Sequence, residues 1–160
     1  MRKRIVGPAS GGSSSSVVDP RWLDVEHHAE VEVTSEDAAH PVESALLHAE
    51  GAPGWRAAEP GPQTIRLRFD EPQRIERIRL VFEERDVART QEFVLRWSAD
   101  GGRTYREIVR QQFNFSPPGT AREVEEYALE LEGVTALELH VVPEIGGGGA
   151  RASLAEWSVG

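Results

Sequence analysis

Hydrophobic and polar residues alternate with a period of two along most of the chain. In residues 64–70, Ile65, Leu67 and Phe69 fall on one face, and charged residues fall on the other. This period is typical of a β-strand with one face buried and the other in water. The same alternation predicts strands over residues 29–34, 64–70, 74–84, 91–98, 105–115, 125–133, 135–143 and 152–159.

Turn-forming sequences separate the predicted strands. Asp100-Gly101-Gly102 predicts a tight hairpin, because glycine adopts a positive φ without steric strain. Residues 35–47 are polar and contain Pro41, which favours a loop with one short helical turn over residues 42–47. No long amphipathic helical pattern occurs. The sequence therefore predicts an all-β fold, an antiparallel β-sandwich or jelly roll of about eight strands.

The N-terminal residues differ from the rest in composition. Residues 1–16 contain the run Gly-Gly-Ser-Ser-Ser-Ser and few large apolar side chains. Such a stretch buries too little surface to offset the entropy lost when it becomes ordered. We expect residues 1–18 to be a disordered leader or linker. Residues 19–160 are then one folded domain, which is long enough to bury a core.

Charge and cysteine content narrow the possible functions. The 160 residues carry a formal charge of −9, which disfavours binding along a phosphate backbone. There is no cysteine, and so no disulfide, zinc–thiolate site or thiol nucleophile. The N-terminus lacks an apolar signal-peptide core, and no apolar run approaches the roughly 20 residues that cross a bilayer. We expect a cytoplasmic protein without membrane contact, or a secreted protein whose signal has been removed.

Four segments in order carry a family resemblance. They are residues 34–57 with Trp55, residues 62–82 with a Gln-x-Ile-x-Leu-x-Phe strand, residues 91–108 with a Ser-x-Asp-Gly turn, and residues 152–159 with Glu156. Together they resemble the discoidin family, also called coagulation-factor C-type or galactose-binding-like domains. The resemblance implies a discoidin-like jelly roll that binds its partners through loops.

A second resemblance covers a shorter part of the chain. Residues 35–65, in which Trp55-Arg56-Ala57-Ala58 follows a Pro-Val-Glu-Ser-Ala-Leu-Leu segment, are similar to the N-terminal domain of an X-ray repair scaffold protein. That domain shares the fold and contacts proteins and damaged DNA. The acidic charge of this chain argues against transferring the DNA role, so a nucleic-acid partner is not expected.

The discoidin resemblance implies a ligand site in the loops at one end of the sandwich. Aromatic faces and polar side chains hold sugars at such sites. Trp55 is the aromatic candidate, and its alternative role is to close one end of the core. Gln112 and Asn114 share one face of their strand, where they either offer amides to a ligand or only meet water. The candidate ligand-binding residues are Trp55, Arg56, Arg89, Gln91, Arg110, Gln112 and Asn114.

The resemblance also implies a structural calcium ion beside the first long loop. Glu156 in the last strand would then be a ligand, together with Glu50 or Glu43 and with backbone carbonyls between them. The alternative role of Glu156 is to accept backbone hydrogen bonds. If an ion is bound, we expect Glu50 and Glu156 to be its side-chain ligands.

Catalytic motifs are absent from the sequence. The five histidines show no metal-binding spacing, and the glycine run at residues 146–149 precedes a predicted strand rather than a helix. Adjacent glutamates such as Glu83 and Glu84 point to opposite faces of a strand, so they do not form an acid–base pair. We expect a non-enzymatic module that binds a carbohydrate or another small polar ligand. The alternative is a protein–protein interaction module within a larger complex.

Overall fold

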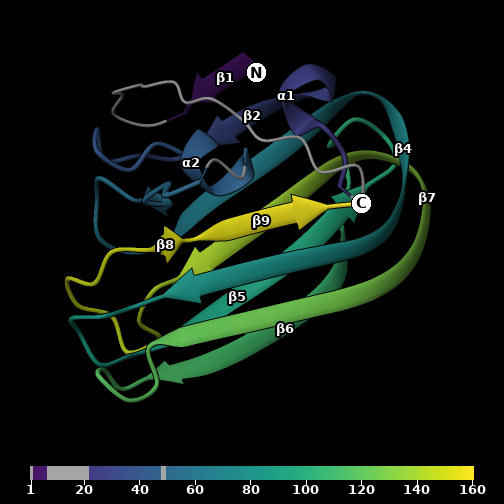
Figure 1. Cartoon of the computed structure of the whole chain (residues 1–160). Helices are drawn as coiled ribbons and strands as arrows, with labels where there is room; N and C mark the ends of the chain where they lie inside the picture. The colour runs from purple at the N-terminus through teal and green to yellow at the C-terminus, as the bar shows by residue number, and fades with distance from the viewer. Residues whose placement is uncertain (1, 7–21, 48–49) are drawn as a thin grey trace.

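The computed structural model of the chain describes residues 2–6, 22–47 and 50–160, and its elements are labelled in Figure 1. In chain order they are β1 (Arg2–Ile5), α1 (Val25–His28), β2 (Ala29–Val33), α2 (Glu43–Leu46), β3 (Trp55–Arg56), β4 (Gln63–Glu83), β5 (Arg89–Ser98), β6 (Arg106–Phe115), β7 (Arg122–Val142), β8 (Ser153–Leu154) and β9 (Glu156–Val159).

Strands build the fold, as the alternation predicts. Seven strands form one sheet in the order β1-β2-β4-β7-β5-β6, with β9 on the free side of β4, and β3 and β8 form a small second sheet. All pairs are antiparallel except β1 with β2, which are parallel, so the main sheet is mixed. The predicted all-β sandwich is confirmed, and the parallel pair of β1 and β2 departs from the predicted antiparallel arrangement.

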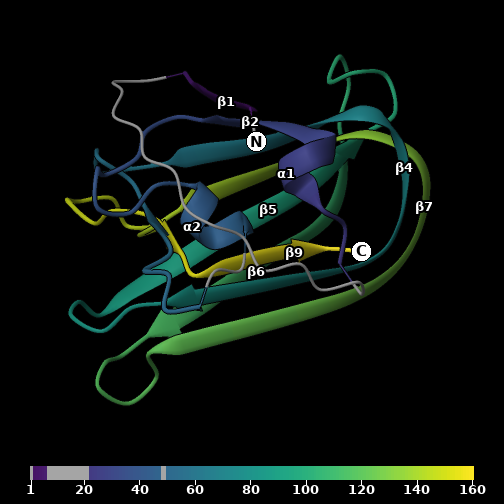
Figure 2. The same ribbon diagram turned by 45° about the horizontal axis from the view of Figure 1, so that its top comes forward.

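The two longest strands fold the main sheet into two layers. The alternation predicts two strands in each of residues 64–84 and 125–143, but β4 and β7 are continuous strands of 21 residues. Their pairing shifts register three times between Arg68 and Arg77, where the ladder bends sharply, as Figures 1 and 2 show. Irregular pairing of this kind increases bend and twist, so both strands cross from one layer to the other.

The N-terminal strand differs from the expected leader. Arg2–Ile5 pairs with Ala29–Val33, and the ammonium of Lys3 lies 2.8 Å from Oε1 of Glu36. The four residues contain one large apolar side chain, too little for a strand to be recognised from alternation. The rest of the expected leader, residues 7–18, lies outside the described residues.

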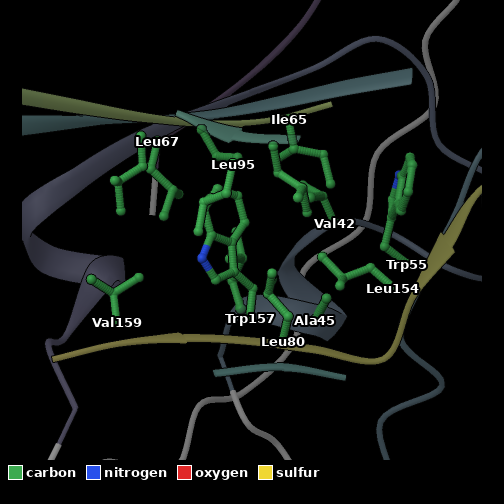
Figure 3. Packing of buried hydrophobic residues seen from close by; sticks show 14 of the residues in the cluster. Val42, Ala45, Trp55, Ile65, Leu67, Leu80, Leu95, Leu154, Trp157 and Val159 are labelled. Carbon is green, nitrogen blue, oxygen red and sulfur yellow. The ribbon is translucent and has the colours of Figure 1, made fainter. Parts of the chain in front are cut away.

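The core lies between the two layers. Ile65 and Leu67 point inward from the first half of β4, while Leu80 points inward from the second half, beside Trp157 of β9 (Figure 3). Phe82 stacks on Phe93 of β5 with ring centroids 5.1 Å apart, which joins the two layers directly. Burying a large apolar side chain of this kind stabilises the folded state by about 1.5–3 kcal/mol.

Helices contribute little to the architecture. Helix α2 follows Pro41 in the long loop after β2, where the sequence predicts one helical turn, and its four residues are all buried. Figure 2 shows α1 and α2 on the same side of the strands. Within the described residues, neither helix is long and apolar enough to cross a membrane.

Candidate functional site

Several loops meet at one end of the sandwich, on the left of Figure 1. Gln63 at the start of β4 pairs with Val141 near the end of β7, and Arg89 at the start of β5 pairs with Phe115 at the end of β6. Strand β4 bends back toward the same end before it joins β5 (Figure 2). We call this end the loop end, and its described connections are residues 34–47 together with 50–62, 84–88, 116–121 and 143–152.

Three of these connections surround a cleft of about 340 Å³. Most of its side chains are charged or polar, and Val87 supplies an exposed apolar contact. Small-molecule sites span roughly 300–1,000 Å³, so this loop-end cleft is at the small end of that range. Its lining residues are Asp37, His40, Arg56, Glu84, Val87, Gly149, Ala150 and Arg151.

Backbone pairing fixes one wall of the cleft. The amide of Asp37 donates to the carbonyl of Arg56 at 2.8 Å, and the amide of Arg56 donates to the carbonyl of His40 at 3.2 Å. The side chains of Asp37 and His40 also meet, with Oδ2 and Nδ1 3.0 Å apart. This hydrogen bond to His40 lowers the pKa of the Asp37 carboxyl, which therefore stays ionised at neutral pH.

A buried ion pair supports the opposite wall. Nε of Arg89 donates to Oε1 of Glu84 at 2.8 Å, and only 1% of the Arg89 side chain is exposed. Burial by itself raises the pKa of the Glu84 carboxyl, but Arg89 and the amides of Asp86 and Val87 outweigh burial and lower it. Glu84 therefore stays ionised and holds the turn that carries Val87.

The guanidinium of Arg89 also reaches two neighbouring segments. Nη1 donates to the carbonyl of Pro143 at 2.9 Å and to Oε1 of Gln91 at 3.1 Å, while Nη2 donates to Oγ of Ser153 at 3.4 Å. Its charge lies 4.8 Å from the ring centroid of Phe115. Arg89 therefore joins the connection after β4 to the connection after β7.

Behind Arg89 lies a buried carboxyl. Nε2 of Gln91 donates to Oε1 of Glu123 at 3.3 Å. Burial, reinforced by the adjacent Glu125 carboxylate, raises the pKa of Glu123 to about 8. Glu123 is therefore largely protonated at neutral pH. The buried Gln91 and Arg89 support the loop end from beneath and do not line the cleft.

Three other candidates lie on the exposed face of β6. Nη1 of Arg110 donates to Oε1 of Glu92 at 2.8 Å, and Nε2 of Gln112 donates to Oε2 of the same glutamate at 3.0 Å. Oδ1 of Asn114 accepts a 2.6 Å hydrogen bond from Thr90. Of the three, Asn114 is nearest the loop end, and none lines the cleft. Their roles in ligand binding stay predictions.

Of the two roles considered for Trp55, the structure places it in the core. The side chain is 1% exposed, and its Nε1 donates to the carbonyl of Ser35 at 2.9 Å. Figure 3 shows it packed near Leu154 and Val42. The next residue, Arg56, lines the cleft, because successive residues in a strand point to opposite sides.

Within the described residues, the carboxylate of Glu156 already has side-chain partners, and its role as a calcium ligand stays a prediction. Its carboxylate lies 3.1 Å from Nε of Arg79 and accepts a hydrogen bond from Ser158. Glu50 is exposed. Within the described residues, one cluster offers three metal-type ligands within reach of one another, and it contains neither glutamate. That cluster is Asp24, Glu26 and His27.

Sequence reasoning missed most of the cleft. Asp37, His40, Glu84 and Arg151 were not among the candidate ligand residues. Asp37, His40 and Arg151 lie in predicted connections, whereas Glu84 is the last residue of a predicted strand. The Asp37-x-x-His40 spacing next to Pro41 is the one local signal that could have pointed there. Arg56 and Arg151, which both line the cleft, are about 95 residues apart in the chain, so their meeting needs the tertiary fold.

The sequence profile of the F5/8 type C domain family matches residues 30–156, which include the loop end and the core strands. The chain belongs to this family. The discoidin resemblance is thereby confirmed. A comparison with curated proteins finds no significant match.

Solved structures with the fold of this F5/8 type C domain include carbohydrate-binding modules. The family 32 module of NanJ from Clostridium perfringens, in complex with galactose, has 13% identity and a TM-score of 0.59 over 82% of this chain and 92% of that one. CBM32-3 from a family 31 glycoside hydrolase of the same organism has 16% identity and a TM-score of 0.61, over 86% and 93%.

A third structure is the CBM32 of AlyQ in complex with 4,5-unsaturated mannuronic acid. It has 14% identity and a TM-score of 0.53 over 81% of this chain and 92% of that one. At these identities the comparisons establish the fold. They do not support the expected cytoplasmic location, and a secreted location stays a prediction.

Proposed function

We propose that this F5/8 type C domain binds carbohydrate at the loop-end cleft. The observation that carries the proposal is the cleft itself, which three connections build on the rigid sandwich. Sites of this kind use loops for contact and strands for position. Structures of the same fold are complexes with galactose and with an unsaturated mannuronic acid, which supports a saccharide ligand.

The lining of the cleft suits sugar hydroxyls. Each hydroxyl donates one hydrogen bond and accepts others. Asp37 accepts, Arg56 and Arg151 donate, and the imidazole of His40 can do either according to its tautomer. Val87, which is 51% exposed, offers an apolar contact for the C–H groups of a sugar ring. The volume of about 340 Å³ suits one or two sugar units.

The proposed activity is binding without catalysis. Glycoside hydrolysis needs a pair of carboxyl groups, one of which stays protonated as the general acid. The two carboxyls of the cleft, Asp37 and Glu84, both have lowered pKa values and remain ionised. Glu123 has a raised pKa but is only 1% exposed, beneath the cleft, where a glycosidic oxygen cannot reach it.

A small polar ligand accounts for the surface better than a broad protein interface does. Protein partners favour contiguous apolar patches. The large hydrophobic residues exposed in the described part of the chain come from four separate segments, and Val87 lines the cleft. They are Val6, Val87, Val124 and Ile145. The protein-interaction alternative and the repair-scaffold likeness stay predictions.

A glycan array followed by titration calorimetry tests the proposal. We expect the wild-type domain to bind at least one saccharide and His40→Ala to weaken that binding about tenfold, the loss of one hydrogen bond to a polar ligand. His27→Ala is the matched control, because His27 is also paired with an aspartate three residues away but lies in α1. No saccharide binding, or equal losses in both variants, would contradict the proposal.

Calcium is tested in the same experiment. Titrations with added calcium and with a chelator show whether an ion contributes. The pairing of Glu156 with Arg79 argues for binding that does not change between the two conditions. If chelation abolished binding and Glu156→Gln did the same, the calcium site that the family resemblance implies would be supported instead.

A further inference from the structure

The charged side chains of the loop-end cleft differ in whether they already bind another residue of the protein. Glu84 forms an ion pair with Arg89, and Asp37 is hydrogen-bonded to His40. These acidic groups therefore have partners within the protein. The two arginines of the cleft differ from them in this respect.

Arg56 and Arg151 are free to meet a ligand. Neither side chain makes a hydrogen bond or close ion pair with any residue in the described ranges, although Arg151 lies near enough to Asp37 to lower its pKa slightly. Arginines on the sheet faces are paired instead, for example Arg66 with Glu138 and Arg110 with Glu92.

Both arginines are held at the cleft by backbone pairing. Arg56 belongs to β3, and its amide and carbonyl both pair with the connection after β2. Arg151 forms a bridge with Gly61, and the carbonyl of the next residue, Ala152, accepts from the amide of Ala57. The two guanidinium groups therefore extend from paired backbone on adjacent segments.

The local charge of the cleft is opposite to that of the chain. The pair of Glu84 and Arg89 cancels, so Arg56 and Arg151 outweigh Asp37, and the cleft is positive on a chain with a formal charge of −9. Guanidinium groups bind carboxylate and sulfate oxygens through paired charge-assisted hydrogen bonds, which are about twice as strong as neutral ones.

The cleft also lacks the usual means of binding a neutral sugar. Its described lining contains no Trp, Tyr or Phe, and Trp55 is buried behind it. Stacking on the apolar face of a sugar ring is therefore unavailable from these residues, and binding must come from polar and charged contacts.

We propose that the ligand of this cleft is an anionic saccharide, whose carboxylate or sulfate group is bound between Arg56 and Arg151. The inference rests on the proposed function, because it assigns the class of sugar to the same cleft. The shared chemistry is a sugar unit with a single anionic substituent, and the experiment distinguishes the two substituents.

Paired sugars test the proposal by titration calorimetry. The probes are galactose, galacturonic acid and galactose 6-sulfate, together with oligosaccharides of mannose and of mannuronic acid. We expect an anionic sugar to bind at least tenfold more tightly than its neutral counterpart, with binding that weakens as salt is raised from about 50 to 500 mM. Tighter binding of galacturonic acid would identify the substituent as a carboxylate, and tighter binding of galactose 6-sulfate would identify it as a sulfate.

Variants assign the effect to the two arginines. Arg56→Gln and Arg151→Gln should each weaken binding of the anionic sugar about tenfold, a larger loss than the same variants cause for its neutral counterpart. Arg103→Gln is the matched control, because Arg103 is exposed in the hairpin between β5 and β6 at the opposite end. Circular dichroism of each variant confirms that it is folded.

The outcomes that overturn the anionic class differ from those that overturn carbohydrate binding itself. If neutral sugars bind as tightly as anionic ones, or if the Arg56 and Arg151 variants lose both equally, the anionic class is overturned and carbohydrate binding stands. If no sugar of either class binds to the folded wild-type domain, the proposed function is overturned together with the inference.

Discussion

Arg89 shows how the tertiary structure changes the role of a candidate ligand residue. Its side chain is buried, and its hydrogen bonds join Glu84, Pro143 and Ser153 beneath the cleft. A guanidinium can donate hydrogen bonds to sugar hydroxyls, but the donors of Arg89 are used within the protein. Arg89 is therefore a positioning residue for the loop end.

Replacing Arg89 tests this role. Arg89→Met keeps most of the side-chain volume but leaves Glu84 as a buried charge without its partner. We expect the free energy of unfolding to fall by about 3–5 kcal/mol, as measured by urea denaturation. Arg89→Met combined with Glu84→Gln should recover part of that loss, because it removes the unpaired charge. A loss below about 1 kcal/mol in the single variant would contradict the structural role.

Glu123 gives a prediction about pH. Its pKa is raised from the ordinary 4.5 to about 8 in the folded protein, so the folded state holds a proton that the unfolded state releases. Its contribution to stability is therefore complete below pH 4.5 and is lost as pH rises toward 8. The neutral variant Glu123→Gln should not show this loss.

Urea denaturation at several pH values measures the effect. Glu123→Gln should be about as stable as wild type near pH 5 and about 1–3 kcal/mol more stable at pH 8. The difference between the two proteins removes the contributions of other titrating groups. A difference that does not grow with pH would show that Glu123 is ionised in the folded state.

At the scale of elements, glycine fixes the approach of two segments near the cleft. Gly54 has a φ of +80°, and a Cβ at this position would lie 2.8 Å from the carbonyl oxygen of Leu154. Gly51 has a φ of +71°, but a Cβ there would meet no described atom within 4 Å. Comparing the two glycines therefore separates the effect of backbone strain from the effect of close packing.

Alanine variants at the two positions test this distinction. Gly51→Ala should lower the free energy of unfolding by about 1–2 kcal/mol, because alanine is strained in the left-handed backbone conformation. Gly54→Ala should cause the same loss and also force β3 away from β8, which adds about 1–3 kcal/mol. We expect thermal denaturation to show a clearly lower Tm for Gly54→Ala than for Gly51→Ala. Equal values of Tm would mean that the close approach to Leu154 is not maintained.

The strands themselves were largely predictable at this scale. The alternating residues 29–34 become β2, and residues 91–98 fall within β5. The continuity of β4 and β7 was not predictable, because proline and glycine are typical of turns, and Pro72 and Gly133 lie where each predicted pair of strands meets. They instead lie within bent strands, since proline and glycine are accepted where the pairing is irregular.

At the scale of the whole molecule, the bent strands join the two layers of the sandwich. Because β4 and β7 belong to both layers, unfolding of one layer disrupts the other. We expect one cooperative unfolding transition in which tryptophan fluorescence and far-ultraviolet circular dichroism coincide. The buried Trp157 reports on the core, and the dichroism reports on the strands. Two separated midpoints would contradict this coupling.

The sequence by itself determined the fold class, since period-two alternation is a local property that survives without knowledge of the partners of each strand. It also located the connections, because turn residues act within a few positions. Only the tertiary structure decided which connections meet, because that depends on long-range strand pairing and on where β4 and β7 bend. Pairing therefore brought Arg56 and Arg151 to one cleft and buried Trp55 and Arg89, two of the candidates that the sequence suggested for ligand contact.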